Sequence, residues 1–244
     1  MLLKHAFGTS KEGIYLHTRS DGRLFNLARL RAKIKVREAL IRDMLFAYDS
    51  AISSHTQQEL QSLMDRFSQA CKDFGLTISH QQGTESLPNI TIDDYELDVV
   101  HHFTYLGSTV TDTLSLDVEF DKRIGKAATT LARLTTRVWF NPMLTEKTKM
   151  AVYNVCVIST LLYGGETWTT YARQERRLNT FHMRSLCRIL GISCQDKVPN
   201  TVVLSYAGLP SMFTLLRQCR LRWLGHIHRM PDGRLPNSLV KLHV

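Results

Sequence analysis

The sequence lacks any apolar run long enough to cross a bilayer. Its mean hydropathy is −0.16 and 22% of its 244 residues are charged, whereas a membrane-spanning helix needs about 20 mainly apolar residues in succession. An apolar leader is absent as well, because Lys4 and His5 directly follow the first three residues, and a secretory signal needs an apolar stretch of about 7 residues or more. We therefore expect an intracellular protein, nuclear or cytoplasmic, without a membrane as a partner.

Cysteine is scarce, and its spacing indicates neither cross-links nor a metal site. The five cysteines are odd in number and widely separated, unlike the disulfide framework of a small secreted domain. Cys187, Cys194 and Cys219 precede His226 and His228, but they include no Cys-x2-Cys pair of the kind found in structural zinc sites. A Ser/His/Asp triad, a phosphate-binding Walker loop and a dinucleotide fingerprint are also absent from the sequence. Buried free thiols are the expected state.

Charge is plentiful but unevenly distributed. The formal net charge is +9, which favours a polyanionic partner such as RNA or DNA. Residues 1–40 carry +6, residues 41–120 carry −10 and residues 121–244 carry +13. An acidic middle between basic ends suits a polymerase or nuclease, in which carboxylates bind metal ions and cations follow the nucleic acid. Two ordinary domains of opposite charge would give the same pattern.

The first part of the chain has the alternating patterns of β-strands. Apolar and basic residues alternate over 29–37, which predicts a half-buried strand with a cationic outer face. Two short apolar runs flank Tyr48-Asp49-Ser50 and predict a tight hairpin with Asp49 at its tip. Further strands are predicted over residues 76–79, 90–92 and 95–100, with extended structure from Phe103 to a turn at Ser108.

One amphipathic helix interrupts these strands. Thr56 and Glu59 form a capping box, and apolar residues at three- and four-residue spacing follow until Gly75. A glycine directly after an apolar periodic run is typical of a helix C-terminus. The sequence therefore predicts a helix between Thr56 and Gly75.

Beyond about residue 115 the apolar spacing becomes helical throughout. Helices are predicted over residues 120–138, 145–163, 173–191, 200–208 and 211–229. In the last of them, Trp223 shares its helical phase with Leu216 and Ile227 and is expected to point into the core. The predicted fold class is α+β, with a boundary near residues 111–116.

A series of short motifs extends over nearly the whole chain. They are Phe46-Ala47-Tyr48-Asp49, Ser53 to Leu60, Phe74 to Ser79, Phe103 to Ser108, Tyr163 to Trp168, Arg188 to Ile192 and Leu221 to His226. In this order they resemble the C-terminal palm, the thumb and the downstream region of a LINE-type reverse transcriptase, from non-LTR retrotransposons. The resemblance implies a partial polymerase palm over residues 1–112, of short antiparallel strands and a helix. An all-α thumb and C-terminal extension follow over residues 113–244.

The resemblance also implies a catalytic site that is incomplete. In this family an aromatic-Ala-Asp-Asp hairpin helps to hold two Mg²⁺ ions about 3.5 to 4 Å apart for phosphoryl transfer. Tyr48 stands where the first aspartate belongs, and a protonated phenol brings no charge to a metal. Only Asp49 is left as a catalytic, metal-binding carboxylate, and the alternative for it is a solvated turn aspartate. The upstream aspartate and template loop, and the lysine expected after Ser79, have no counterpart here.

Basic helices are better candidates for a functional site than the hairpin. Arginines are concentrated in two of the predicted helices with few acidic residues nearby, which suits phosphate contacts. The candidates are Arg176, Arg177, Arg184, Arg188, Arg217, Arg220 and Arg222. The resemblance adds Tyr105, Leu106 and Gly107, in a hairpin that would hold a primer strand. A solvated charged face is the alternative for the arginines, and hairpin packing is the alternative for Tyr105 and Leu106.

Three functions remain open at this point. The chain is one part of a working RNA-directed DNA polymerase, which needs an N-terminal palm or fingers portion supplied elsewhere. It is a catalytically defective fragment that retains nucleic-acid binding, which needs only the basic helices. It is the product of a decayed reading frame without a selected role, or a basic helical protein with a structural one. Defective catalysis with retained RNA or DNA binding is the reading adopted here.

Overall fold

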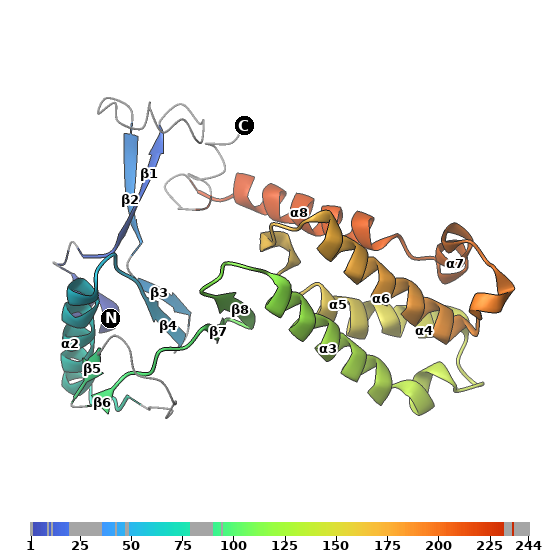
Figure 1. Cartoon of the computed structure of the whole chain (residues 1–244), viewed down its shortest axis with the longest axis horizontal. Helices are drawn as coiled ribbons and strands as arrows, with labels where there is room; N and C mark the ends of the chain where they lie inside the picture. The colour runs from blue at the N-terminus through green and yellow to red at the C-terminus, as the bar shows by residue number, and fades with distance from the viewer. Residues whose placement is uncertain are drawn as a thin grey trace. The chain divides into compact units, whose positions relative to one another are not determined.

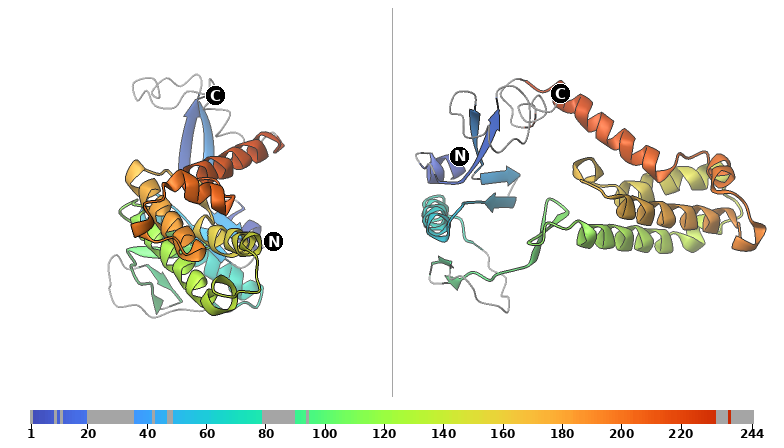
Figure 2. Two further views of the ribbon diagram at one scale, coloured as in Figure 1. Left: turned by 90° about the vertical axis from the view of Figure 1, so that its right-hand side faces the viewer. Right: turned by 45° about the horizontal axis from the view of Figure 1, so that its top comes forward.

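Helices make up most of the secondary structure, and short antiparallel strand pairs accompany them near the N-terminus (Figures 1 and 2). The computed structural model describes residues 2–8, 10, 12–19, 36–41, 43–46, 49–78, 90–93, 95–231 and 236. Over these residues the fold class is α+β, as predicted. The chain divides into two units, one of residues 1–107 with 229–244, the other of residues 108–228. No helix in the described ranges combines the length and apolar character of a membrane span.

The first unit contains two helices and seven strands in its described ranges. The helices are α1 (Leu2–Phe7) and α2 (Gln57–Asp73). The strands are β1 (Ile14–Arg19), β2 (Val36–Ile41), β3 (Asp43–Phe46), β4 (Asp49–Ile52), β5 (Thr91–Ile92), β6 (Tyr95–Glu96) and β7 (His102–Tyr105). Strands β1 and β2, β3 and β4, and β5 and β6 pair antiparallel as three separate hairpins.

Helix α2 confirms one bond of the predicted capping box and organises this unit, while the Glu59 carboxylate accepts from the His55 amide and not from that of Thr56. Thr56 Oγ1 accepts a hydrogen bond from the Glu59 amide at 3.3 Å, which satisfies one of the free donors of the first turn. Gly75 follows the helix with a φ of +67°, a value that a glycine adopts without strain. On the apolar face, Phe7 of α1 stacks on Phe67 with ring centroids 6.4 Å apart. The side chains of Leu63 and Phe7 are completely buried there.

Several strand predictions need correction. Of the alternating segment 29–37, residues 29–35 lie outside the described residues, and the strand seen is β2. Residues 76–78 form no strand, because the Leu76 amide donates to the Cys71 carbonyl oxygen and closes the end of α2. The strand predicted over 95–100 ends at Glu96, since β5 offers only two residues to pair with it. Leu106 (φ +48°) and Gly107 (φ +79°) form the predicted turn after β7.

The second unit is helical except for one strand. It begins with β8 (Ser108–Thr111), and its α-helices are α3 (Asp117–Arg133), α4 (Glu146–Val152), α5 (Ser159–Leu161), α6 (Ala172–Leu190), α7 (Asn200–Ala207) and α8 (Met212–His228). Four shorter turns join them, namely η1 (Thr135–Trp139), η2 (Tyr153–Ile158), η3 (Gly165–Thr167) and η4 (Cys194–Asp196). The predicted helices are confirmed, apart from the π-helical turns η1 and η2 that interrupt two of them.

One continuous core holds the second unit together. Helix α3 packs against α5 and α6, and α6 also contacts α7 and α8, an arrangement visible in Figure 1. Trp139, Tyr153, Leu178, Leu186 and Leu216 are almost fully buried in this core. The Trp139 indole donates a hydrogen bond to the Leu131 carbonyl oxygen at 2.7 Å, so its polar edge is satisfied inside the protein.

A buried histidine makes the stability of this core pH-dependent. His182 Nδ1 lies 3.0 Å from the Tyr153 hydroxyl and Nε2 lies 3.3 Å from the Pro210 carbonyl oxygen. Since that carbonyl only accepts, Nε2 carries the proton and Nδ1 accepts from the tyrosine. Burial, only partly offset by the bond to Pro210, lowers the pKa of His182 to about 4. The imidazole is therefore neutral in the folded protein.

We expect the free energy of unfolding to fall as the pH decreases from about 6.5 toward 4. Over this range the unfolded chain gains a proton on His182 and the folded protein does not, which costs up to about 3 kcal/mol. Urea unfolding at several pH values measures the effect. His182→Gln keeps one donor and one acceptor but does not titrate, so it should flatten the profile in this range. An equally steep profile in the variant would assign the pH dependence to other groups.

Candidate nucleic-acid interface

Helix α6 carries the strongest concentration of cations in the second unit. The Tyr171 amide donates to Gln174 Oε1 at 2.9 Å and caps the N-terminus of the helix. Gly191, with a φ of +68°, ends it. Leu178 and Leu186 anchor one face in the core, and arginines occupy the opposite face. Burial of the apolar face thus fixes the direction in which the arginines project.

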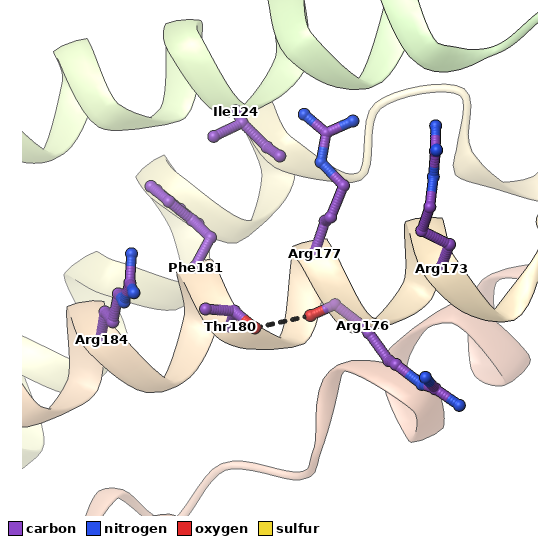
Figure 3. A pocket seen from close by; sticks show the side chains of 7 residues that line it. All are labelled: Ile124, Arg173, Arg176, Arg177, Thr180, Phe181 and Arg184. Atoms are coloured by element: carbon purple, nitrogen blue, oxygen red, sulfur yellow. Dashed lines mark hydrogen bonds between the residues drawn. The ribbon is translucent and has the colours of Figure 1, made fainter.

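The arginines line an open pocket beside α3. It has a volume of about 500 Å³ and is lined by Ile124, Arg173, Arg176, Arg177, Thr180, Phe181 and Arg184. Figure 3 shows these side chains along α6, with Ile124 reaching toward them from α3. An apolar floor with cationic walls favours a partner that combines flat or apolar parts with negative charge.

Two of these arginines are held by carboxylates of α3. Arg173 contacts Asp117 at 2.9 Å, and Arg177 contacts Asp117 at 3.8 Å and pairs with Asp121. Hydrogen bonds from Gln174 first, and from Arg173 next, hold the pKa of the Asp117 carboxyl below its usual value. These two guanidinium groups are thus partly neutralised and connect α6 to α3.

Three other arginines of α6 do not pair with the α3 carboxylates. Arg176, Arg184 and Arg188 are exposed. Arg184 and Arg188, four residues apart, share one side of the helix, whereas Arg176 projects from another side (Figure 3). Within the described ranges no acidic side chain forms an ion pair with any of them. We call these three residues the arginine row. Its positive charge is left available to a partner.

The candidate arginines of α8 lie in different surroundings. Arg217 and Arg222 are exposed, and the Arg222 guanidinium donates to Cys219 Sγ at 3.3 Å. Arg220, a candidate for phosphate contacts, is half-buried and makes an ion pair with Glu175 at 3.5 Å. It also donates to the Trp168 carbonyl oxygen and to Thr170. We therefore assign Arg220 to the packing of α8.

The hairpin candidates belong to the first unit. The Tyr105 hydroxyl donates to the Met44 carbonyl oxygen at 3.0 Å, so β7 lies beside β3. Leu106 is partly exposed, and Leu106 and Gly107 form the turn. A turn with positive φ at both central residues suits two closely joined strands. The primer-holding role of this hairpin stays a prediction.

The predicted catalytic hairpin is present, but its carboxylate stands apart from other ligands. Phe46 of β3 pairs with Asp49 of β4. Asp49 is therefore the first residue of a strand, whereas the sequence predicted it at the tip of the hairpin. Tyr48 lies outside the described residues. No group of three or more His, Cys, Asp or Glu side chains that fits a metal ion gathers among the residues with assigned positions. Those residues do not fit a two-Mg²⁺ site, which needs several converging carboxylates, and we derive no catalytic step from it.

Sequence reasoning did not identify the α3 side of the pocket. Asp117 is 56 residues from Arg173, and Asp121 is 56 residues from Arg177, so no local spacing indicates such pairs. Trp223 was expected in the core but is only half-buried. It lies 5.5 Å from the His226 ring, centroid to centroid, beside a second pocket.

Comparisons with known proteins identify a transposon-derived relative. No protein-family profile and no solved structure matches the chain. An uncharacterized transposon-derived protein of Caenorhabditis elegans is 24% identical over 211 residues, which cover 79% of this chain and 73% of the relative. This similarity supports a transposon origin for the chain.

Proposed function

We propose that this chain derives from the reverse transcriptase of a LINE-type retrotransposon and binds RNA or DNA through α6, without completing a polymerase site itself. Three findings support the proposal. The relative from Caenorhabditis elegans is transposon-derived, the motifs follow the order of this polymerase family, and the second unit carries most of the positive charge. We do not propose that this chain forms one part of a working polymerase.

The observation that carries the proposal is the arginine row. Four residues advance an α-helix by about 6 Å, so Arg184 and Arg188 present charges about two nucleotides apart along a duplex. Arg176 adds a third charge about 12 Å from Arg184 along the helix axis, projecting from another side of α6 (Figure 3). Guanidinium groups suit phosphate because they donate two parallel hydrogen bonds. Arg184 and Arg188 therefore match one strand of a nucleic-acid backbone, and such phosphate contacts read no sequence.

The paired arginines contribute in a different way. Arg173 and Arg177 connect α6 to α3 through Asp117 and Asp121, on either side of the pocket. The carboxylates also repel phosphate at this end of the helix. We therefore place the nucleic-acid track toward the C-terminal part of α6, where Arg184 and Arg188 lie.

The test is a salt titration of the full chain with an RNA–DNA heteroduplex. Each phosphate contact contributes about −0.9 to the slope of log affinity against log salt. Three contacts predict a slope of −2.7 or steeper, hence at least about a 40-fold loss of affinity between 50 and 200 mM salt. Adding a neutral osmolyte in place of salt should leave the affinity unchanged. A salt-independent affinity, or no binding at low salt, would contradict the proposal and favour a decayed or purely structural protein.

A further inference from the structure

Trp223 occupies a core position of α8 but has no complete cover. Leu216 and Ile227 lie on the same side of the helix and are buried, whereas the indole between them is half-buried. An indole is the largest apolar side chain, and it is usually covered when its phase points inward. The exposed face of the Trp223 indole is therefore available for stacking with a planar ligand.

A pocket opens directly at this indole. It has a volume of about 310 Å³ and is lined by Glu166, Cys219, Arg222, Trp223 and His226. The His226 ring is tilted 37° from the indole plane, so the two rings form adjoining walls. Glu166 supplies the carboxylate, and Arg222 supplies the cation.

The frame of this pocket is fixed by contacts within the unit. Arg220 connects α8 to the segment after η3 through the Trp168 carbonyl oxygen at 3.2 Å and Thr170 at 2.5 Å. A Cβ atom on Gly165 would lie only 3.7 Å from Leu216 Cδ2, so η3 packs closely on α8. Glu166 and Trp223 are thus held near each other by neighbours that line no part of the pocket.

We propose that this pocket takes one unpaired nucleobase bearing an exocyclic amino group, from a strand bound to the same unit. This inference rests on the proposed nucleic-acid binding and deepens it. An aromatic face stacks on any base, and the Arg222 guanidinium suits the adjoining phosphate. The Glu166 carboxylate accepts from an amino N–H and repels a carbonyl oxygen. Adenine, cytosine and guanine carry that amino group, while uracil and thymine do not.

The test compares oligo(dC) with oligo(dU) on the full chain above neutral pH. The two strands share their backbone and ring size. They differ at the 4-position, where cytosine has an amino donor and uracil a carbonyl acceptor, and at the neighbouring N3, where cytosine has an acceptor and uracil an N–H donor. We expect oligo(dC) to bind roughly tenfold tighter. Binding should quench indole fluorescence through Trp223, because Trp139 and Trp168, the other two tryptophans, are buried.

Two variants and one control separate recognition from packing. Glu166→Gln should bring the ratio of the two affinities close to one, because an amide both donates and accepts. Trp223→Leu should weaken binding of either strand about tenfold and abolish the quenching, while duplex binding through α6 remains. Tyr206→Leu removes an exposed aromatic ring of α7 and should change neither quantity.

Each contrary result has a distinct meaning. Equal affinities of the native protein for the two strands, or an unchanged ratio in Glu166→Gln, would overturn the base pocket and leave duplex binding intact. A Trp223→Leu protein that melts at a lower temperature but binds normally would assign the indole to packing and overturn the pocket as well. Failure to bind any strand or duplex at low salt would contradict the proposed function itself.

Discussion

Glu119→Leu should lower the free energy of unfolding by about 3 to 5 kcal/mol, because it removes the carboxylate that pairs with a buried arginine. The side chains of Glu119 and Arg123 are 2% and 5% exposed, and Arg123 Nε lies 2.7 Å from Glu119 Oε1. The second carboxylate oxygen accepts the Thr109 amide at 2.7 Å, and that donor would also lose its partner. Urea denaturation of the native protein and the variant measures the loss.

Two companion variants test the reason for this loss. Glu119→Gln keeps an acceptor for Thr109 but removes the charge, so we expect an intermediate loss of stability. Glu119→Leu combined with Arg123→Met removes both charges and should recover a large part of the loss, since a buried ion pair contributes little beyond well-packed apolar groups. A loss below about 1 kcal/mol in Glu119→Leu would show that water reaches this pair in solution.

The helical part of the fold was predictable because its signals are local. Three- and four-residue apolar spacing defines α3, α6 and α8, and Gly191 marks the end of α6. The π-helical turn from Tyr153 to Ile158 was not predictable. A π-helical turn contains one extra residue, which shifts the helical phase of all residues that follow. Because apolar residues occur on every side of this segment, their spacing does not reveal the shift.

The strands of the first unit were harder to predict, because a strand needs a partner. The alternation over 95–100 satisfies a strand pattern, yet pairing ends at Glu96, opposite the first residue of β5. The Leu97 amide does donate to Ile90, at 2.7 Å, one position beyond the paired strands. The length of each strand is thus decided by its neighbour, which a pattern in one segment does not contain.

The candidate site shows the same division between local and distant signals. The common side of Arg184 and Arg188 follows from their spacing within α6. The partners of Arg173, Arg177 and Arg220 come from elements about 50 residues away, so no local spacing separates these three arginines from those of the row. Tertiary contacts thereby divide one set of similar residues into those that hold the fold and those that remain available to a ligand.

Replacing the whole arginine row by alanine should weaken heteroduplex binding about 500-fold at 0.1 M salt. At 1 M salt the electrostatic contribution to the affinity has nearly vanished. For each phosphate contact, the logarithm of the affinity rises by about 0.9 when the salt concentration falls tenfold, from 1 M to 0.1 M. Three contacts therefore account for about 2.7 units, and the slope against log salt should become shallower by the same amount. Arg176, Arg184 and Arg188 are exposed, so the melting temperature of the variant should change little.

Two control proteins distinguish this site from a general effect of charge. Lys126→Ala, Arg133→Ala and Lys147→Ala together remove three exposed cations outside α6 and should weaken binding far less, because only contacts near phosphate release counterions. Lysine at all three positions of the row should retain most of the affinity, since a point charge still neutralises phosphate but gives up the bidentate bond. Equal losses in the row variant and in the three-cation control would show that net charge alone attracts the nucleic acid and that α6 forms no specific track.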